Sequence, residues 1–359
     1  TTHKTLGGPR GAAIITHRKD LSSKIDRGVF PGEQGGPHVN TIAALAVALK
    51  LAQSDQFKAL QRRTVENAKR LADKLSARGL HVAFGGTNTH LLNVDCKTIV
   101  GPDGTALTGD MGARLLDLVG VVANRQTIPG DRSALRPSGV RLGTPWITQR
   151  GFGPVEIDAL GDIIADVMLA AVPFSYPDRR RDKARAKIDF ATLHNARLRV
   201  RDLAANVGID TDTEIEGYPH VDYLSPMETG ENWQMLSIKG SRATAFLDVA
   251  LTSDVYALKL ESSQPTYVLA PDGAELARGV LRYESEGVYQ LHINRNADYI
   301  ASWFRSLSDG FVTFAPDDPY ARVPGPVDVQ MVGATELHMF DEQAGMALHK
   351  AYFIGRDGE

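Results

Sequence analysis

The sequence has a single cysteine, Cys96, in 359 residues, and almost no excess charge of either sign. One cysteine cannot form an internal disulfide, so we expect a reducing compartment and a cytoplasmic location. The 40 basic and 43 acidic residues give a net charge of −3, which argues against nucleic acid or an anionic membrane as the main partner. No apolar run approaches the ~20 residues of a membrane span, and the best candidate, IAALAVALKLA, is interrupted by Lys50.

Two common site signatures are also missing. The 10 histidines are scattered without the paired spacing of a zinc site, so we expect no metal. The glycines at 143, 151 and 153 do not follow the dinucleotide-binding fingerprint. What is present is the balance of a globular protein, with 43% apolar and 23% charged residues. At about 150 residues per domain, the length suggests two or three domains.

Residues 1–175 read as an α/β unit that begins with loops. Residues 1–40 are rich in glycine and proline, which is typical of loops that approach a ligand or a neighbouring chain. The segment 41–51 is apolar almost all round and predicts a buried helix. The next helix is expected to begin at a Ser54 cap and to end at Gly79. Further helices are expected over 110–118 and 155–171, and short strands at HVAF, HLLNVD and VRLGT.

The rest of the chain divides into a charged segment and an α+β unit. Residues 176–201 contain DRRRDKARAK and predict a solvated linker helix, with a basic docking patch as the alternative. Residues 202–359 have strand-like runs at QMLSIKG, VYALKLES, PTYVLAP, GVLRYES and VYQLHIN. Helices are expected at SRATAFLDVAL, with a Ser241 cap, and at ADYIASWFRSL.

The strongest chemical signal lies at TTHKTLGGPRG, where Lys4 stands between His3 and Thr5. A lysine amine attacks carbonyls only when it is partly deprotonated, which a crowded or cationic setting favours. His3 and Arg10 can contribute to such a setting. On composition alone, Lys4 would be an ordinary surface lysine.

Four sequence motifs favour a chemical role for Lys4 over that of an ordinary surface lysine. In order they are TTHKTLGGPRGA, VFPGEQGGPHVNTIAALAVALK, GGTNTHLLNVD and SGVRLGTPWITQRG. Together they resemble the serine hydroxymethyltransferase family over residues 1 to about 175. The resemblance implies the C-terminal part of a fold-type I transferase that depends on pyridoxal 5'-phosphate. Such enzymes interconvert serine and glycine, with tetrahydrofolate as the one-carbon acceptor.

The resemblance also assigns roles to residues of this chain. Lys4 matches the lysine that holds the cofactor covalently, His3 the histidine beside it, and Arg10 the arginine of the GPRG loop. Gly35 and Gly36 match glycines that reach the cofactor phosphate of the partner subunit, which implies a homodimer or larger assembly. Two glycines leave backbone N–H groups free to surround a phosphate, although such a pair can also form a simple tight turn.

Further matches concern the substrates. Arg141 matches the arginine that binds the amino-acid carboxylate, for which its guanidinium fork is suited. The alternative for Arg141 is a surface salt bridge. Ser133, Ala134 and Leu135 fall at a folate-contacting loop, where the family has Ser-Pro-Phe. The family's Asn-Lys-Asn becomes Asn-Arg-Gln at 124–126, so the folate contacts differ while the cofactor signature is kept.

The second half has a weaker resemblance, at about residues 190–310, to the aminomethyltransferase family, the glycine-cleavage T-proteins. It implies a partial folate-binding domain over 202–359. Two acidic positions of that family fall at Ala277 and Arg278, which argues against ordinary aminomethyl transfer. A folded interaction or scaffold domain is the alternative for this half.

The expected whole is a piece of a fusion protein of one-carbon metabolism, truncated at both ends and inactive alone. Only three residues precede Lys4, whereas the family supplies several cofactor contacts before that lysine. The expected activity is that of a glycine hydroxymethyltransferase. The alternatives are a degenerate folate-binding or regulatory module, and a threonine-type aldol cleavage.

Overall fold

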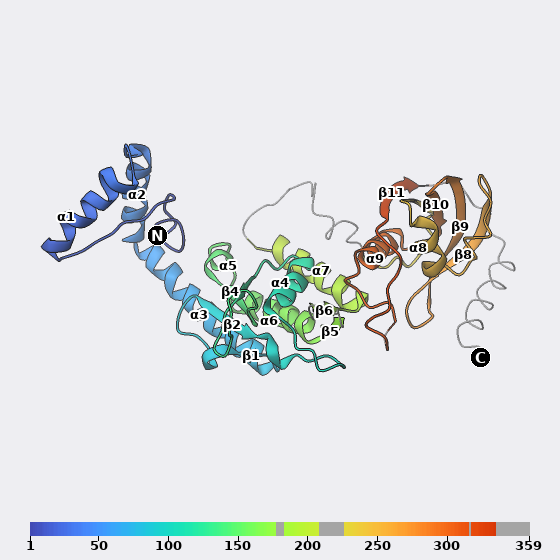
Figure 1. Ribbon diagram of the computed structural model, residues 1–359, viewed down its shortest axis with the longest axis horizontal. Coiled ribbons are helices and arrows are strands. Elements are labelled where there is room, and N and C mark those ends of the chain that lie inside the picture. The colour runs from blue at the N-terminus through green and yellow to red at the C-terminus, as the bar shows by residue number, and fades with distance from the viewer. Residues whose placement is uncertain (177–182, 208–225, 316, 335–359) are drawn as a thin grey trace.

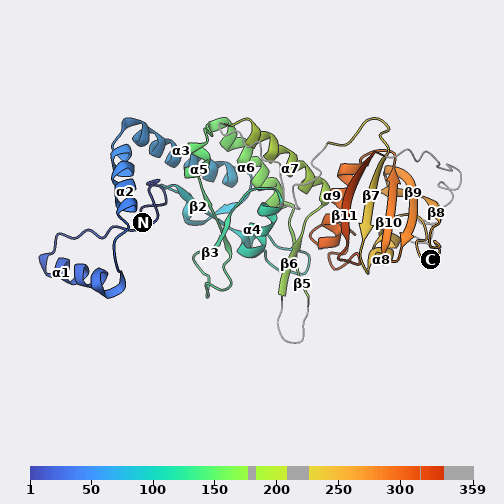
Figure 2. The ribbon, with the colours of Figure 1, turned by 90° about the horizontal axis from the view of Figure 1, so that it is seen from above.

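The computed structural model describes all residues except 177–182, 208–225, 316 and 335–359. Three parts follow one another along the long axis of the molecule (Figure 1, Figure 2). An N-terminal arm spans residues 1–53, a central α/β part follows it, and an α+β part contains the last sheet. The expected α/β and α+β elements are therefore present, in the expected order.

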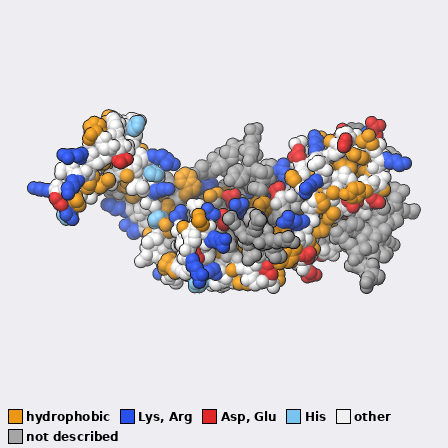
Figure 3. All heavy atoms as spheres, in the orientation of Figure 1, with side chains coloured by type: hydrophobic (Ala, Val, Ile, Leu, Met, Phe, Trp, Pro, Cys, Tyr) orange, Lys and Arg blue, Asp and Glu red, His pale blue; other side chains and the backbone are white. Residues whose placement is uncertain are grey.

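The arm contains α1 (Lys19–Arg27), the distorted turn η1 (Gly28–Glu33) and α2 (Val39–Ala52). The predicted helix over 41–51 is present as α2, but the prediction that it is buried is wrong. Ala48 is its one buried residue, whereas Val47 and Leu51 are each 61% exposed. An apolar helix is stable only when its surface is covered, and the described residues leave most of this surface open. Figure 3 shows hydrophobic side chains on the surface of the arm.

The helix α3 (Asp55–Ala77) leads from the arm into the central part. Its start is the one predicted, because the Ser54 hydroxyl accepts a hydrogen bond from the Phe57 backbone N–H at 3.2 Å. Its buried face includes Ala68, Leu71 and Leu75. The helix stops before Gly79, whose φ of +93° lies in the left-handed region that glycine adopts without strain.

A four-stranded antiparallel sheet with the order β1-β2-β4-β3 forms the central part. Its helices α3, α4 and α6 pack on the sheet or on one another. The strands predicted at HLLNVD and VRLGT and the helices predicted over 110–118 and 155–171 are present, whereas the strand predicted at HVAF is limited to β1. The short β3 and α5 were not predicted. The elements are β1 (His81–Val82), β2 (Leu91–Asp95), α4 (Gly109–Leu118), β3 (Asn124–Gln126), β4 (Gly139–Gly143), α5 (Pro145–Gln149) and α6 (Pro154–Leu169).

The linker helix expected over 176–201 is wrong for the described residues that precede α7. A two-stranded antiparallel ribbon of β5 (Val172–Tyr176) and β6 (Lys183–Lys187) stands there instead, and 177–182 lie outside the described residues. The KARAK sequence alternates charged and small residues, a period of two that suits a strand. The helix α7 (Phe190–Ala205) follows, with an Asp189 cap on the Thr192 N–H at 2.8 Å. It crosses the boundary expected at 201.

The α+β part has a five-stranded antiparallel sheet with the order β11-β7-β10-β9-β8. Four of the five predicted strands are confirmed, as are both helices. Its elements are β7 (Gln234–Lys239), α8 (Ala243–Ala250), β8 (Ser263–Leu269), β9 (Glu275–Ser285), β10 (Val288–Ile293), α9 (Ala297–Asp309) and β11 (Asp328–Ala334).

Two local predictions in this part are wrong. VYALKLES, 255–262, forms turns because its buried residues Val255 and Leu258 are three apart rather than two. The Asp248 carboxylate also accepts the Val255 N–H at 3.0 Å, which fixes the turn. The N-cap of α8 is Arg242 rather than Ser241. The Arg242 side chain makes no capping hydrogen bond to the first turn of the helix.

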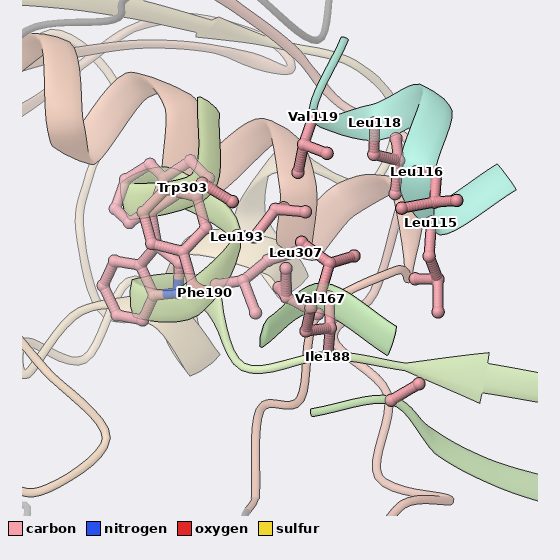
Figure 4. Close-up of a cluster of buried hydrophobic side chains, with 14 of the residues drawn as sticks. Leu115, Leu116, Leu118, Val119, Val167, Ile188, Phe190, Leu193, Trp303 and Leu307 are labelled. Carbon is pink, nitrogen blue, oxygen red and sulfur yellow. The ribbon is translucent and has the colours of Figure 1, made fainter. Parts of the chain in front are cut away.

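One hydrophobic core runs through the central and the last part. Figure 4 shows side chains from α4, α6, α7 and α9 gathered in one cluster, among them Phe190, Leu193, Trp303 and Leu307. The backbone N–H of Ile188 donates to the Phe311 carbonyl at 3.1 Å, beside this cluster. The two halves of the chain are therefore packed together rather than joined by a solvated linker.

Arg197 of α7 lies in the same interface and is 3% exposed. Its Nε donates to the Leu118 carbonyl of α4 at 2.9 Å, and its Nη1 donates to the Ser302 hydroxyl of α9 at 3.0 Å. Burial lowers the pKa of Arg197 to about 10, so the guanidinium is still charged at neutral pH.

We expect Arg197→Ala to lower the free energy of unfolding by about 2–4 kcal/mol, because it leaves a cavity and buried polar groups without partners. Urea unfolding followed by circular dichroism measures the change. Arg63→Ala, at an exposed position of α3, is the matched control and should change stability by less than ~0.5 kcal/mol. Equal effects of the two substitutions would contradict the role given to Arg197.

Candidate functional site

The loop around Lys4 is closed by hydrogen bonds at its base. The backbone N–H of Thr2 donates to the Gly11 carbonyl at 3.1 Å, and the Thr2 hydroxyl donates to the Pro9 carbonyl at 2.6 Å. The Gly11 N–H donates to Nδ1 of His3 at 3.4 Å. Lys4 itself is exposed. The fold therefore presents the Lys4 amine on a constrained loop.

Two of the glycines of this loop, Gly7 and Gly8, are required by its geometry. Gly7 has φ +71°, in the left-handed region. A Cβ at Gly8 would lie 2.8 Å from the Thr2 carbonyl oxygen and 3.3 Å from the Ala48 side chain, so the loop packs closely on α2. The structure thus brings His3, Lys4 and the exposed Arg10 into one loop on the arm.

Gly35 and Gly36 lie in the exposed segment between η1 and α2. A Cβ at either position would meet no atom within 4 Å, and neither has a positive φ. A tight turn therefore does not explain why these residues are glycines. Their backbone N–H groups lie on an open surface that another molecule can approach.

Arg141 lies in the middle of the sheet, on β4. It is opposite Asn93 of β2 and Asn124 of β3. Its Nη1 donates to Oε1 of Gln126 at 3.3 Å, and no carboxylate of the described chain pairs with it. The salt-bridge alternative thus finds no support among those residues, and the guanidinium has donors to spare for an anion.

Asn93 is a candidate site residue that was not predicted from the sequence. Its side-chain Oδ1 is buried without a hydrogen-bond partner in the structure, and it lies on the strand next to Arg141. A buried acceptor without a partner is costly unless a ligand satisfies it. The signal in the sequence was the polar residue at the centre of LLNVD, between two buried positions.

The loop at Ser133 to Leu135 is an exposed turn between β3 and β4. The Ser133 hydroxyl accepts the Leu135 N–H at 3.1 Å, and Leu135 is 85% exposed. Ala134 is exposed as well. Within the described residues, no hydrogen bond or ion pair links this turn or Arg141 to the Lys4 loop.

Asp131 holds the base of that turn. Its carboxylate accepts the backbone N–H groups of Ile128 at 3.0 Å and Ser138 at 2.9 Å, and also bonds to the Ser138 hydroxyl. Lys97 lies 3.8 Å away. Burial tends to raise the pKa of Asp131, but these hydrogen bonds and the Lys97 charge outweigh it and keep the pKa below the usual value.

Within the residues that the structure describes, no cluster of three or more His, Cys, Asp or Glu could hold a metal ion. In the same part of the chain, no helix combines the length and the apolar character needed to cross a membrane. Cys96 is buried, and this burial raises the pKa of its thiol to about 12, which makes it a poor nucleophile.

Comparison with known proteins bears on the first half of the chain. Residues 1–164 match the family model for serine hydroxymethyltransferase. A mitochondrial serine hydroxymethyltransferase of Eremothecium gossypii is 46% identical over 186 residues, 48% of this chain and 36% of the relative. A serine hydroxymethyltransferase of Bombyx mori is 46% identical over 178 residues, 46% of this chain and 37% of the relative. The chain thus spans little more than a third of the length of these relatives.

The expected cytoplasmic location is wrong on this evidence. Relatives from Eremothecium gossypii, Kluyveromyces lactis and Schizosaccharomyces pombe are named as mitochondrial proteins. The physical reason for the error is that a single reduced cysteine indicates a reducing compartment and does not distinguish one such compartment from another.

We expect Asp131→Asn to lower the free energy of unfolding at pH 7 by about 1–3 kcal/mol, because the bonds from Ser138 and Ile128 lose their charged acceptor. The folded-state pKa of Asp131 is depressed, so its contribution is complete above the ordinary carboxyl pKa of about 4 and is lost as the pH falls through the folded value.

The measurement is urea unfolding at several pH values between neutral and strongly acidic. The difference between wild type and Asp131→Asn should shrink as the pH falls. Asp55→Asn, at a fully exposed position, is the control and should show little difference at any pH. A constant difference for Asp131→Asn would rule out the carboxylate as its source.

Proposed function

We propose that residues 1–164 belong to a glycine hydroxymethyltransferase that depends on pyridoxal 5'-phosphate. The enzyme would transfer a hydroxymethyl group reversibly between serine and tetrahydrofolate. The observation that carries the proposal is the constrained loop that presents Lys4, within a segment that matches serine hydroxymethyltransferases at up to 46% identity. The family model and the relatives support the activity, and the roles of individual residues are part of the proposal.

The donor chemistry of the chain fits an aldehyde cofactor that bears a phosphate. The Lys4 amine is exposed and can condense with a carbonyl. Gly35 and Gly36 offer unobstructed backbone N–H groups, as a phosphate requires. Arg10, on the same loop as Lys4, adds a positive charge. When bound, the cofactor supplies an electron sink for the α-carbon of the amino acid.

The remaining roles concern the substrates. Arg141 would bind the amino-acid carboxylate with two parallel N–H donors, while Gln126 fixes one side of its guanidinium. Asn93, on the neighbouring strand, would orient the same substrate through its unpartnered Oδ1. His3 would help to move a proton near the Lys4 amine. The turn at Ser133, Ala134 and Leu135 would contact folate.

The arm supports the further proposal of a homodimer. Its helix α2 exposes Val39, Val47 and Leu51 by more than half of their surface. Soluble proteins rarely leave such a continuous apolar face in water, and a second copy would cover it. The open glycines at 35 and 36 lie in the segment directly before this helix, where a partner subunit's cofactor would reach them.

A second candidate, a folate-binding module without catalysis, concerns residues 202–359. In the structure Ala277 is fully buried on β9, and Arg278 pairs with Glu231 at 2.9 Å. Neither position offers a carboxylate for chemistry. These observations favour a non-catalytic role for this half, whether as a partial aminomethyltransferase-like folate domain or as a scaffold.

Reductive labelling tests the role of Lys4. We expect pyridoxal phosphate followed by borohydride to label Lys4 at least about tenfold faster than other exposed lysines, since Lys4 lies on a hydrogen-bonded loop that also carries His3 and Arg10. Peptide mapping by mass spectrometry gives the rate at each lysine. Lys58, exposed on α3 and paired with Asp55, is the internal control.

Equal labelling of Lys4 and Lys58 would overturn the assignment of Lys4. The Lys4→Arg variant should remove the fast phase and leave the slow reaction of the other lysines unchanged. Binding of tetrahydrofolate without selective labelling would favour the non-catalytic module.

Sedimentation velocity tests the proposed dimer. We expect Val47→Glu to weaken self-association at least about tenfold, because it places a charge in the apolar interface. Val155→Glu is the matched control, because Val155 is 75% exposed on α6, outside the arm. A monomeric wild-type chain at high protein concentration, or equal effects of both variants, would contradict the proposal.

A further inference from the structure

We propose that a cavity between the two halves of the chain binds a small aromatic anion that carries a phosphate or carboxylate group. The cavity has a volume of about 820 Å³ and lies between α4, the β5–β6 ribbon, the end of α9 and the segment 321–326. None of the residues assigned above to the cofactor or the substrates lines it. It therefore requires a separate explanation.

The lining carries an excess of positive charge. Five of its side chains are basic, against the two acids Asp110 and Asp309. Asp110 is already paired with Arg114, with Nε and Oδ2 3.0 Å apart. The other four bases have no carboxylate partner within salt-bridge distance among the described residues; they are Arg185, Lys187, Arg242 and Arg322. The lining therefore carries more positive than negative charge, which favours an anion.

Lys187 is the most informative of these bases. It is 4% exposed, and its Nζ donates to the Ala321 carbonyl. Burial, and then the charge of Arg322, lower the pKa of Lys187, while the charge of Asp318 opposes this shift. An ammonium group has three donors, and a buried one is stable when they are satisfied. A bound anion would supply a further acceptor and a compensating negative charge.

Aromatic rings form another wall of the cavity. Nζ of Lys187 lies 5.8 Å from the centre of the Phe174 ring, and Cζ of Arg322 lies 4.4 Å from the centre of the Tyr176 ring. Phe311 and Phe314 also line the cavity. The volume far exceeds that of a single phosphate, and rings beside cations suit a flat organic body. This is why we infer an aromatic anion rather than an inorganic one.

The site belongs to both halves at once. Lys187 comes from the ribbon that follows the central part, whereas Arg242 and the segment 321–326 come from the last part. The Nη1 of Arg242 donates to the Gly325 carbonyl at 2.9 Å, which holds that segment in place. A ligand in the cavity would contact both halves and should stabilise their packing.

Isothermal titration of the 359-residue chain with phenyl phosphate tests the site. We expect saturable binding at one site per chain. Lys187→Met should weaken it at least about tenfold, because it keeps the side-chain volume and removes the charge. Arg185→Gln should weaken it severalfold without loss of folding, since Arg185 is exposed. Lys58→Met is the matched control and should bind like the wild type.

Three further titrations define the ligand. Benzoate should bind if a carboxylate suffices, inorganic phosphate should bind more weakly than phenyl phosphate, and benzyl alcohol should not bind. Thermal unfolding should shift upward with phenyl phosphate in the wild type and less in Lys187→Met, provided that circular dichroism shows the variant to be folded. Absence of saturable binding by every anion, or binding that neither Lys187→Met nor Arg185→Gln weakens, would overturn the proposal.

Discussion

The docking of α7 determines how the two halves of this protein are related. Its Arg197 guanidinium is charged and almost fully buried, so it is stable only where polar groups accept its hydrogen bonds. One partner is the Leu118 carbonyl at the C-terminus of α4, the end of a helix where the dipole favours a cation. The other is the Ser302 hydroxyl of α9. These bonds fix three helices relative to one another. Arg197 and Ser302 are each 3% exposed, so these bonds are shielded from water. The same three helices contribute side chains to the apolar cluster of Figure 4.

In the N-terminal arm, by contrast, an apolar surface is left exposed to solvent. Its loop at Lys4 is well determined, because Thr2 bonds to both Pro9 and Gly11 and Gly8 lies against Ala48. Yet the helix that supports the loop has most of its apolar surface exposed. The loop is ordered by hydrogen bonds between residues close together in the sequence. The apolar surface of α2, in contrast, would be covered only by another molecule.

This contrast explains which features could be predicted from the sequence. The start of α3 at Ser54 and its end at Gly79 were correct, because caps are set by neighbouring residues. The strand expected at 255–262 was wrong because carboxylates such as Asp248 bond to its backbone from elsewhere. The burial expected for α2 was also wrong, since apolar composition does not say which surface covers a helix. The charged run before Phe190 was predicted to be helical but forms a strand of the β5–β6 ribbon, because charge alone does not determine the backbone conformation.

The same reasoning separates the predictable from the unpredictable parts of the candidate site. Motifs placed Lys4, Gly35 and Arg141, but no motif indicated the buried Oδ1 of Asn93, which becomes visible only through strand register. Arg141 donates to Gln126 and pairs with no carboxylate in the described residues, so in the role proposed for it the guanidinium would be oriented before a carboxylate bound. A preoriented guanidinium loses little entropy when it binds a carboxylate, and this makes a sheet position better suited to recognition than a loop. The Lys4 loop, by contrast, sits on the arm, so alignment of its amine with Arg141 would depend on whatever covers α2.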